Sequence, residues 1–324
     1  MIKNIILLIV VVFFSMNMGA SGIAPSFAAA YGGRLIRKVQ ALLLFSACVT
    51  LGAVTLGKNV TLTMGKGLLP QQIITFDVAL IILASATLGL FLANALKIPQ
   101  STSQVTVGAI VGAGLYFGNM NYATLFLKVI PLWIVLPLSS YILTFLLYRI
   151  VYPPLHDNLH LYQKIFANEK KLRMASLIAS CYVAFAIGAN NAANAVGPLF
   201  GAGIVQMIPG LLLVAPLFGI GAWVMGKGTM ETAGCEIVPL GMVSSTLVAF
   251  VTATVLIIAS LGGVPQSLVQ LNILSILAVG CLKNGHRHTL DRHVTRKTFA
   301  VWTLSPLLAV CISYLLLLVF SIRR

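Results

Sequence analysis

The chain has 324 residues, of which 59% are hydrophobic and 8% are charged. A soluble domain carries about 25% charged residues, so this composition excludes an ordinary soluble enzyme or binding domain and predicts an integral membrane protein. The formal net charge of +15 does not indicate a nucleic-acid-binding protein, because the basic residues lie between apolar runs, where they set membrane topology and contact anionic lipid headgroups.

Ten apolar segments follow one another and predict an all-α fold, because the alternating strand pattern of a membrane β-barrel is missing. The first segment resembles a secretory signal peptide, but an internal repeat includes it, so we expect it in the mature protein. The segments near 101–118 and 266–282 are short, and either could be part of a re-entrant hairpin instead of crossing the membrane. In chain order the segments lie near 4–31, 39–57, 73–96, 101–118, 122–151, 172–200, 204–226, 237–262, 266–282 and 298–322.

Three motifs occur in the same order in both halves of the chain, which indicates a duplicated architecture. The aligned pairs are 16–33 with 185–202, 52–58 with 221–227, and PQSTSQ at 99–104 with PQSLVQ at 265–270. The offset is 169 residues for the first two pairs and 166 for the third.

An odd number of crossings in each half inserts the second half upside down, which is the inverted-repeat architecture of many secondary transporters. We therefore predict a first inverted repeat over 1–151, a cytoplasmic connector over 152–173 and a second inverted repeat over 174–324.

The basic residues are distributed unevenly between the two sides of the membrane. If all ten segments cross, 15 of the 21 Lys and Arg residues lie on the side of the connector. The positive-inside rule then places the connector in the cytoplasm and both termini outside, in a multi-pass protein of the plasma membrane. The side of the termini carries the other six: Lys3, Lys58, Lys66, Lys128, Arg323 and Arg324.

The aligned stretches 16–33 and 186–199 contain Gly, Pro and Asn where an apolar helix should continue. They predict helices broken in mid-membrane, whose free backbone N–H groups and helix dipoles form an anion site. The alternative is that these residues only let helices pack closely, but the occurrence of the pattern in both halves favours a site. The candidate substrate-binding residues are Gly19, Ala20, Ser21 and Gly22 in the first half and Gly188, Asn190, Asn191 and Asn194 in the second.

A run of three hydroxyl groups follows Pro99 and precedes a Gly-rich helix, which indicates a second part of the same site. An N-cap alone is the alternative. The aligned stretch keeps only the first hydroxyl group, so we expect the halves to contribute unequally. The candidates are Ser101, Thr102 and Ser103, with Ser267 in the second half.

No cofactor, nucleotide or metal site is expected. The stretches 52–58 and 221–227 match GxxxxGK, but Asn59 and Gly228 stand where a P-loop needs Ser or Thr. GHRHTLDRH at 285–293 is better explained as a basic, lipid-facing loop than as a metal site. The five cysteines contain no CxxC pair and are interpreted as small core residues.

These motifs resemble the inorganic phosphate transporter (PiT) family. GANNAANAVGPL is similar to its duplicated GANDVANAFG signature, and PQSTSQ is similar to its PVSTTH motif. The resemblance implies an inverted-repeat helical fold, often a homodimer, with substrate between the two broken helices and the hydroxyl motif. Gly22 and Asn191 stand where the family has Asp, and MNMGASG and IPQSTSQVTVGA resemble in particular its sulfate permease (CysP-like) branch.

The sequence therefore predicts a secondary transporter, not an enzyme, that imports sulfate by alternating access as an ion-coupled symporter. Sulfate needs only hydrogen-bond donors, whereas hydrogen phosphate also benefits from an acceptor, and no acidic residue lies in these motifs. A phosphate symporter of the same fold and the permease subunit of an ATP-driven importer remain alternatives. The coupling ion is a proton or sodium, and the acids near apolar segments are Asp77, Glu231 and Glu236.

Overall fold

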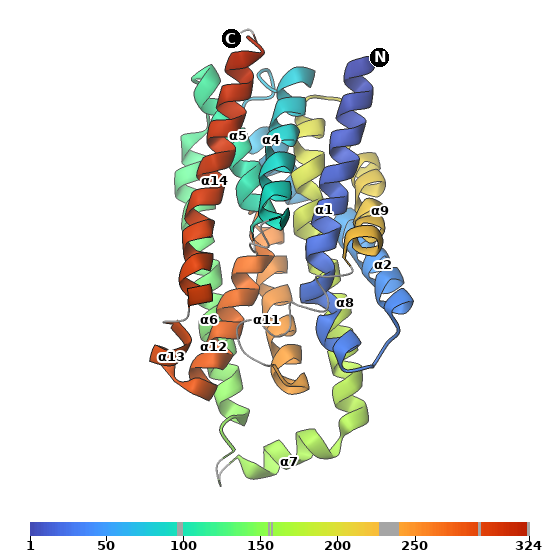
Figure 1. The fold of residues 1–324 in the computed structure, drawn as a ribbon, viewed down its shortest axis with the longest axis vertical. Coiled ribbons are helices and arrows are strands. Elements are labelled where there is room, and N and C mark those ends of the chain that lie inside the picture. The colour runs from blue at the N-terminus through green and yellow to red at the C-terminus, as the bar shows by residue number, and fades with distance from the viewer. Residues whose placement is uncertain (96–99, 155, 157, 227–239, 291–292, 323–324) are drawn as a thin grey trace.

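The computed structural model describes residues 1–95, 100–154, 156, 158–226, 240–290 and 293–322. All regular secondary structure in these residues is helical (Figure 1), which confirms the predicted all-α fold. The first half contains α1 (Ile2–Gly32), α2 (Lys38–Leu56), α3 (Lys58–Leu62), the π-helix η1 (Thr63–Gly67), α4 (Phe76–Ala95), α5 (Thr102–Phe117), the π-helix η2 (Thr124–Val129) and α6 (Ile130–Val151). The remainder contains α7 (Leu159–Ala167), α8 (Glu169–Gly201), α9 (Met207–Met225), α11 (Met242–Leu261), α12 (Leu268–Asn284), α13 (His286–Leu290) and α14 (His293–Val319).

Seven helices in the described residues are long and apolar enough to cross a membrane, so the chain is a multi-pass membrane protein. Large apolar side chains cover their outer faces. Leu43 on α2 and Trp223 on α9, for example, are 67% and 70% exposed, as suits contact with lipid rather than water. The seven spans are Ile2–Gly32, Lys38–Leu56, Thr124–Val151, Glu169–Gly201, Met207–Met225, Met242–Leu261 and Ala300–Val319.

The two halves run through the molecule in opposite directions. In Figure 1 both chain ends lie at one end of the molecule and α7, within the predicted connector, lies across the other. Helix α1 therefore runs from the end with the termini toward α7, whereas its counterpart α8 starts beside α7 and runs back.

The packing partners of the helices are also exchanged between the halves. Helix α1 packs against α9, and its counterpart α8 packs against α2. Helix α5 packs against α14, and its counterpart α12 packs against α6. If each helix is replaced by its counterpart in the other half, the same pairs of packed helices result. The fold therefore consists of two inverted repeats.

Helices α4 and α5 form a re-entrant hairpin that enters and leaves at the end with the termini. Asp77, at the start of α4, pairs with Lys3 near the N-terminus at 2.8 Å. Tyr116, at the end of α5, donates a hydrogen bond of 2.9 Å to the carbonyl of Ile322 near the C-terminus. The short segment near 101–118 is therefore the returning arm of a hairpin, one of the two options that its length allows.

Helices α11 and α12 form the corresponding hairpin from the end with α7 (Figure 1). The start of α11 lies beside the α1–α2 connection, where Met242 approaches Gly33, and α12 leads into His286, whose ring lies 5.9 Å from that of Phe145 on α6. With one hairpin in each half, three helices per half cross the membrane instead of five, because α11, although long and apolar enough to span, is an arm of the second hairpin. The number stays odd, so the inverted topology is retained. Lys97 and residues 227–239, which include Glu231, Cys235 and Glu236, lie outside the described residues.

The prediction of broken helices at 16–33 and 186–199 is wrong. Helix α1 is continuous over Ile2–Gly32 and includes Pro25, and α8 is continuous over Glu169–Gly201 and includes Pro198. Each proline removes only the one backbone hydrogen bond that its own nitrogen would donate, so the helices continue through Pro25 and Pro198. The chain interruptions of the membrane interior occur instead where the hairpins turn.

Glycines in these stretches allow two close helix crossings. Gly19 on α1 lies against the carbonyl of Phe218 on α9, and Gly188 on α8 lies against that of Val49 on α2. A Cβ atom at either glycine would overlap the carbonyl oxygen. The reciprocal contacts at the same crossings are Gly221 with Met16 and Gly52 with Phe185, related by the repeat.

Gly19 and Gly188 were predicted to offer free backbone N–H groups to the substrate, and the structure contradicts this. Inside a continuous helix their N–H groups bond to the carbonyl four residues earlier, as do those of Ala20, Ser21 and Gly22. Close packing of small residues, the alternative reading, is the role that the structure gives to Gly19 and Gly188.

Candidate functional site

The starts of α5 and α12 meet in the middle of the molecule. Ser101 is the N-cap of α5 and accepts a hydrogen bond of 3.2 Å from the backbone N–H of Gln104. Ser267 is the N-cap of α12 and accepts the same bond, also 3.2 Å, from Gln270. Both serines are buried. The two hairpin tips are thus built alike, and each directs the positive end of a helix of 16 or 17 residues toward the centre.

The chemistry of this centre suits an anion although no charged side chain is buried in the described residues. The first N–H groups of a helix have no partner within it, and two helix starts together form a strong anion-binding environment. Every polar side chain that is buried in the described part of the chain is Ser, Thr, Asn or Gln. The attraction therefore comes from backbone dipoles and neutral donors.

Asn194 on α8 joins the site to the first hairpin. Its Nδ2 atom donates to the hydroxyl groups of Ser103, at 3.2 Å, and Thr102, at 3.4 Å. The residue is fully buried, and its Oδ1 atom has no hydrogen-bond partner. The structure therefore brings three of the predicted residues, Thr102, Ser103 and Asn194, into one cluster.

Asn190 holds the tip of the second hairpin. Its Nδ2 atom donates to the Ser260 hydroxyl group and to the Val264 carbonyl, both at 3.0 Å, and its Oδ1 atom accepts from the backbone N–H of Gln266 at 3.0 Å. All polar atoms of this side chain are thus engaged by the protein. Asn191 is the next residue along α8, and its buried Oδ1 atom has no partner.

Two further elements hold the same tip. Trp133 on α6 donates from Nε1 to the carbonyl of Pro265 at 2.8 Å. Asn59 on α3 donates to the carbonyl of Leu261 at 2.8 Å. Asn59 is the residue that excludes a P-loop in the sequence, and its structural role is to fasten the end of α11.

Helix α1 in the first half does not supply polar side chains like the asparagines of α8. Ser21 donates to the carbonyl of Met18 in its own helix at 3.0 Å, and Ala20 has no polar side chain. Gly22 faces apolar groups, because a Cβ atom there would lie 3.2 Å from Phe45 and 3.4 Å from Ile187. The position where the resembling family has its first Asp is thus enclosed by apolar side chains, and the polar side chains come from α8.

Four glutamines at the hairpin tips were not among the predicted site residues. Each is at most 6% exposed, and the side-chain oxygen of each has no hydrogen-bond partner. In Gln266 the Nε2 atom also has none. The signal was present in the sequence, because PQSTSQ and PQSLVQ share both glutamines, but only the hydroxyl groups of this motif were interpreted. The four are Gln100, Gln104, Gln266 and Gln270, named below the hairpin glutamines.

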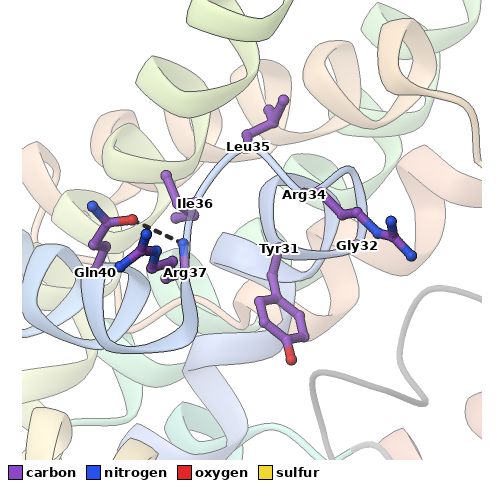
Figure 2. A pocket seen from close by; sticks show the side chains of 7 residues that line it. All are labelled: Tyr31, Gly32, Arg34, Leu35, Ile36, Arg37 and Gln40. Carbon is purple, nitrogen blue, oxygen red and sulfur yellow. Dashed lines mark hydrogen bonds between the residues drawn. The ribbon is translucent and has the colours of Figure 1, made fainter.

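An open cavity of about 560 Å³ lies elsewhere, at the connection between α1 and α2. Tyr31, Arg34, Arg37 and Gln40 line it, and Figure 2 shows Arg34 and Arg37 extending to opposite sides of the connecting loop. Because its cations do not converge and it lies at the end of the two helices, this cavity is not the central site.

The chemistry available at the centre is hydrogen bonding to a polar ligand. The cluster offers hydroxyl groups, carboxamides and helix N-termini, and the described residues contain no group of three or more His, Cys, Asp or Glu side chains. Two inverted repeats around a buried, uncharged site define a membrane transporter.

Comparison with known proteins shows to which family of transporters the chain belongs. The model of the phosphate transporter family matches residues 18–313, and the chain belongs to this family. It is 37% identical to sulfate permease CysP of Bacillus subtilis over 95% of this chain and 85% of the relative. It is 28% identical to a putative phosphate permease of Pyrococcus furiosus over 85% and 87% of the two chains.

A solved structure shares the fold. The sodium-dependent phosphate transporter superposes with a TM-score of 0.85, covers 99% of both chains and is 24% identical in sequence. Family and fold are those of a membrane transporter.

Proposed function

We propose that this protein is a secondary active transporter that imports inorganic sulfate across the plasma membrane by alternating access. The observation that carries the proposal is the meeting of two buried helix starts beside the amide of Asn194 and the hydroxyl groups of Thr102 and Ser103. The first N–H groups of the two helices and the Thr102 hydroxyl group can donate to an anion, and the Asn194 amide and the Ser103 hydroxyl group can do so once they leave their present acceptors. Sulfate, a dianion without a proton at neutral pH, needs donors only. The similarity to a sulfate permease supports the same substrate.

A neutral site also suits release. A buried Arg or Lys would hold a dianion tightly through a charge-assisted bond. Helix dipoles and short neutral side chains bind more weakly, so the substrate leaves the site in each cycle.

The two hairpins provide alternating access in this proposal. They approach the centre from opposite ends of the molecule, and Ser103 on the first donates to the carbonyl of Gln266 on the second at 3.1 Å. Each hairpin separates the site from one side of the membrane. Because the repeats are inverted, exchanging their conformations opens the site to the opposite side.

We further propose that a sodium ion is cotransported, with a proton as the alternative. The two described acids, Asp77 and Glu169, pair with Lys3 and Arg173 away from the centre, so neither offers a titrating group beside the substrate. Carboxamide oxygens without partners, on Asn191 and Asn194 among others, are suitable ligands for sodium. Relatives named as sodium-dependent phosphate transporters point the same way.

Inorganic phosphate is the second candidate substrate. The same carboxamide oxygens can accept a hydrogen bond from the hydroxyl group of hydrogen phosphate. Amide oxygens can therefore take the place of the carboxylate acceptors that the motifs lack. The relatives named as phosphate permeases support this alternative.

Uptake of labelled sulfate into proteoliposomes tests the proposal. The purified protein is reconstituted alone, and uptake is measured under a sodium gradient and, separately, under a proton gradient. Phosphate, thiosulfate, selenate and molybdate are added as competitors. We expect sulfate uptake driven by the sodium gradient and weak competition by phosphate.

Other outcomes decide between the alternatives. Uptake by the protein alone eliminates the permease subunit of an ATP-driven importer, which requires an ATPase partner. Stronger uptake of phosphate than of sulfate would establish the second candidate. If neither anion enters or exchanges, the transport proposal is wrong.

The placement in the membrane is proposed on the charge bias and the family resemblance. We place both termini outside and α7 in the cytoplasm, in a homodimer. Membrane-impermeant thiol labelling of Ser321→Cys and Lys170→Cys in whole cells tests the sidedness; labelling of the second alone would reverse it. Light scattering of the detergent-solubilised protein tests the dimer.

A further inference from the structure

The hairpin glutamines occur as two pairs related by the repeat. Gln100 aligns with Gln266 and Gln104 with Gln270 at the offset of 166. Within each hairpin, one glutamine precedes the N-cap serine and the other is the third residue of the helix. The pair therefore brackets the helix start, where an anion would bind.

These glutamines are buried, and the side-chain oxygen of each has no hydrogen-bond partner. Gln266 is 0% exposed with neither amide atom partnered, and Gln104 is 4% exposed with its oxygen unpartnered. A buried amide without partners is strongly unfavourable, and native proteins rarely tolerate it. Four such oxygens on two hairpin tips, which the Ser103–Gln266 hydrogen bond joins at 3.1 Å, indicate that a polar ligand completes the hydrogen bonds of these amides.

We propose that the hairpin glutamines contact the transported oxyanion and determine its selectivity, an inference that rests on the proposed function. A carboxamide carries a donor and an acceptor, and a half-turn of its last bond exchanges them. Toward sulfate the NH₂ groups donate. Toward an anion that carries a proton, such as hydrogen phosphate, the amide oxygen accepts a hydrogen bond from the hydroxyl group of the anion.

This assignment gives each repeat a matched share of the site. Asn194 and Asn191 come from α8, and the first repeat has no equivalent side chain at the aligned positions. The glutamines, in contrast, come equally from the tips of the two hairpins. Both hairpins then hold the anion, so its binding couples to the positions of both.

The first test replaces a glutamine by an apolar side chain of similar length. Gln104→Met and Gln270→Met each remove a hydrogen bond to a charged ligand, so we expect the KM for sulfate to rise about tenfold or more. Sulfate exchange is measured in proteoliposomes with the same pH on both sides, and the same variants are assayed with phosphate.

The second test changes the chemistry without changing the shape. In Gln104→Glu an ionised carboxylate would repel a dianion, whereas the protonated carboxyl group can donate to it. We expect sulfate exchange, relative to wild type, to be lost at about pH 8 and to rise as the pH falls toward about 5. Sulfate stays a dianion throughout, so the substrate does not cause this profile.

Gln71, an exposed residue at the end of the molecule with the termini, provides the matched control. Gln71→Met and Gln71→Glu should exchange sulfate like wild type at every pH. A purely structural role of Gln104 would lower the amount of folded protein and leave the KM of that fraction and its preference for sulfate over phosphate unchanged.

Two results separate the inference from the proposed function. If wild type exchanges sulfate and the Met variants keep its KM and selectivity, the glutamines do not contact the anion and the inference is wrong. If wild type exchanges only phosphate, the sulfate proposal is wrong, and the KM for phosphate in the same variants then decides the role of the glutamines. If a variant fails to fold, Gln270→Glu supplies the pH profile from the other hairpin.

Discussion

Ser103 on α5 and Gln266 before α12 are joined across the centre of the molecule, with 3.1 Å between the Ser103 hydroxyl group and the Gln266 carbonyl. They are 163 residues apart and belong to hairpins that enter from opposite ends. The hydrogen bond closes the space between the hairpin tips, and Asn194 donates to the same hydroxyl group. Any movement of one tip therefore changes the surroundings of the other.

Replacing Asn194 by Ala should impair transport more than folding. The change removes the amide that donates to Thr102 and Ser103, which in the proposed site also donates to the substrate. A lost hydrogen bond to a charged ligand weakens binding about tenfold or more. We expect sulfate uptake to fall by at least that factor in proteoliposomes with equal amounts of inserted protein.

Asn121 provides a matched control for this variant. It accepts from the backbone N–H of Thr124 on the surface, at 3.0 Å, far from the centre. Asn121→Ala should cost about 1 kcal/mol of stability, as for a lost helix cap, with normal uptake. Normal uptake by Asn194→Ala as well would move the substrate site elsewhere.

Replacing Asn190 by Ala should act through stability. Three hydrogen bonds to the second hairpin disappear, and buried groups of Val264 and Gln266 lose their partner. We expect a loss of about 2–4 kcal/mol, seen as a lower melting temperature of the detergent-solubilised protein. The KM for sulfate in the folded fraction should change little; a large rise in KM at unchanged melting temperature would show that Asn190 binds substrate directly.

The helix crossings predict a sharp difference between two Gly→Ala changes. In Gly188→Ala the new methyl group would overlap the Val49 carbonyl of α2, so α2 and α8 must separate and the protein should lose about 1–3 kcal/mol or more. In Gly32→Ala the methyl group meets no atom within 4 Å, and Ala is a better helix former than Gly. Expression level and melting temperature measure both, and equal stability of the two variants would contradict the crossing.

Asp77→Asn should leave transport nearly unchanged. Asp77 pairs with Lys3 at 2.8 Å, and the two side chains are 36% and 68% exposed, so the bond contributes less than about 1 kcal/mol. We expect uptake within about twofold of wild type under a sodium gradient and under a proton gradient. Loss of uptake driven by the proton gradient alone would make Asp77 the proton-coupling group.

Local pattern was sufficient for part of the candidate site. Ser101 and Ser267 are N-caps, the role that the sequence offered as the alternative to substrate binding, and three residues predicted to share one site, Thr102, Ser103 and Asn194, lie in one cluster. The Asn-rich stretch was misread as a helix break because Gly, Asn and Pro disfavour helices in isolation. Close packing against α2 and the tip of the second hairpin stabilises the helix there. These neighbours are distant in the sequence, so helix propensity alone does not predict their effect.

The sequence by itself determined the membrane class, the two inverted repeats and the family. Apolar length and loop charge follow from contact with lipid or water, and the recurring motif can be recognised within short segments. The tertiary structure decided that α4–α5 and α11–α12 are re-entrant hairpins, that Gly19 and Gly188 serve packing, that Asn190 fastens a hairpin and that the side-chain oxygens of four buried glutamines have no partner. Each of these depends on which helix lies opposite a residue. For Gly19 and Gly188 that neighbour comes from the other half of the chain, and for Asn190 it lies 70 to 76 residues away in the same half, so no short segment contains both partners.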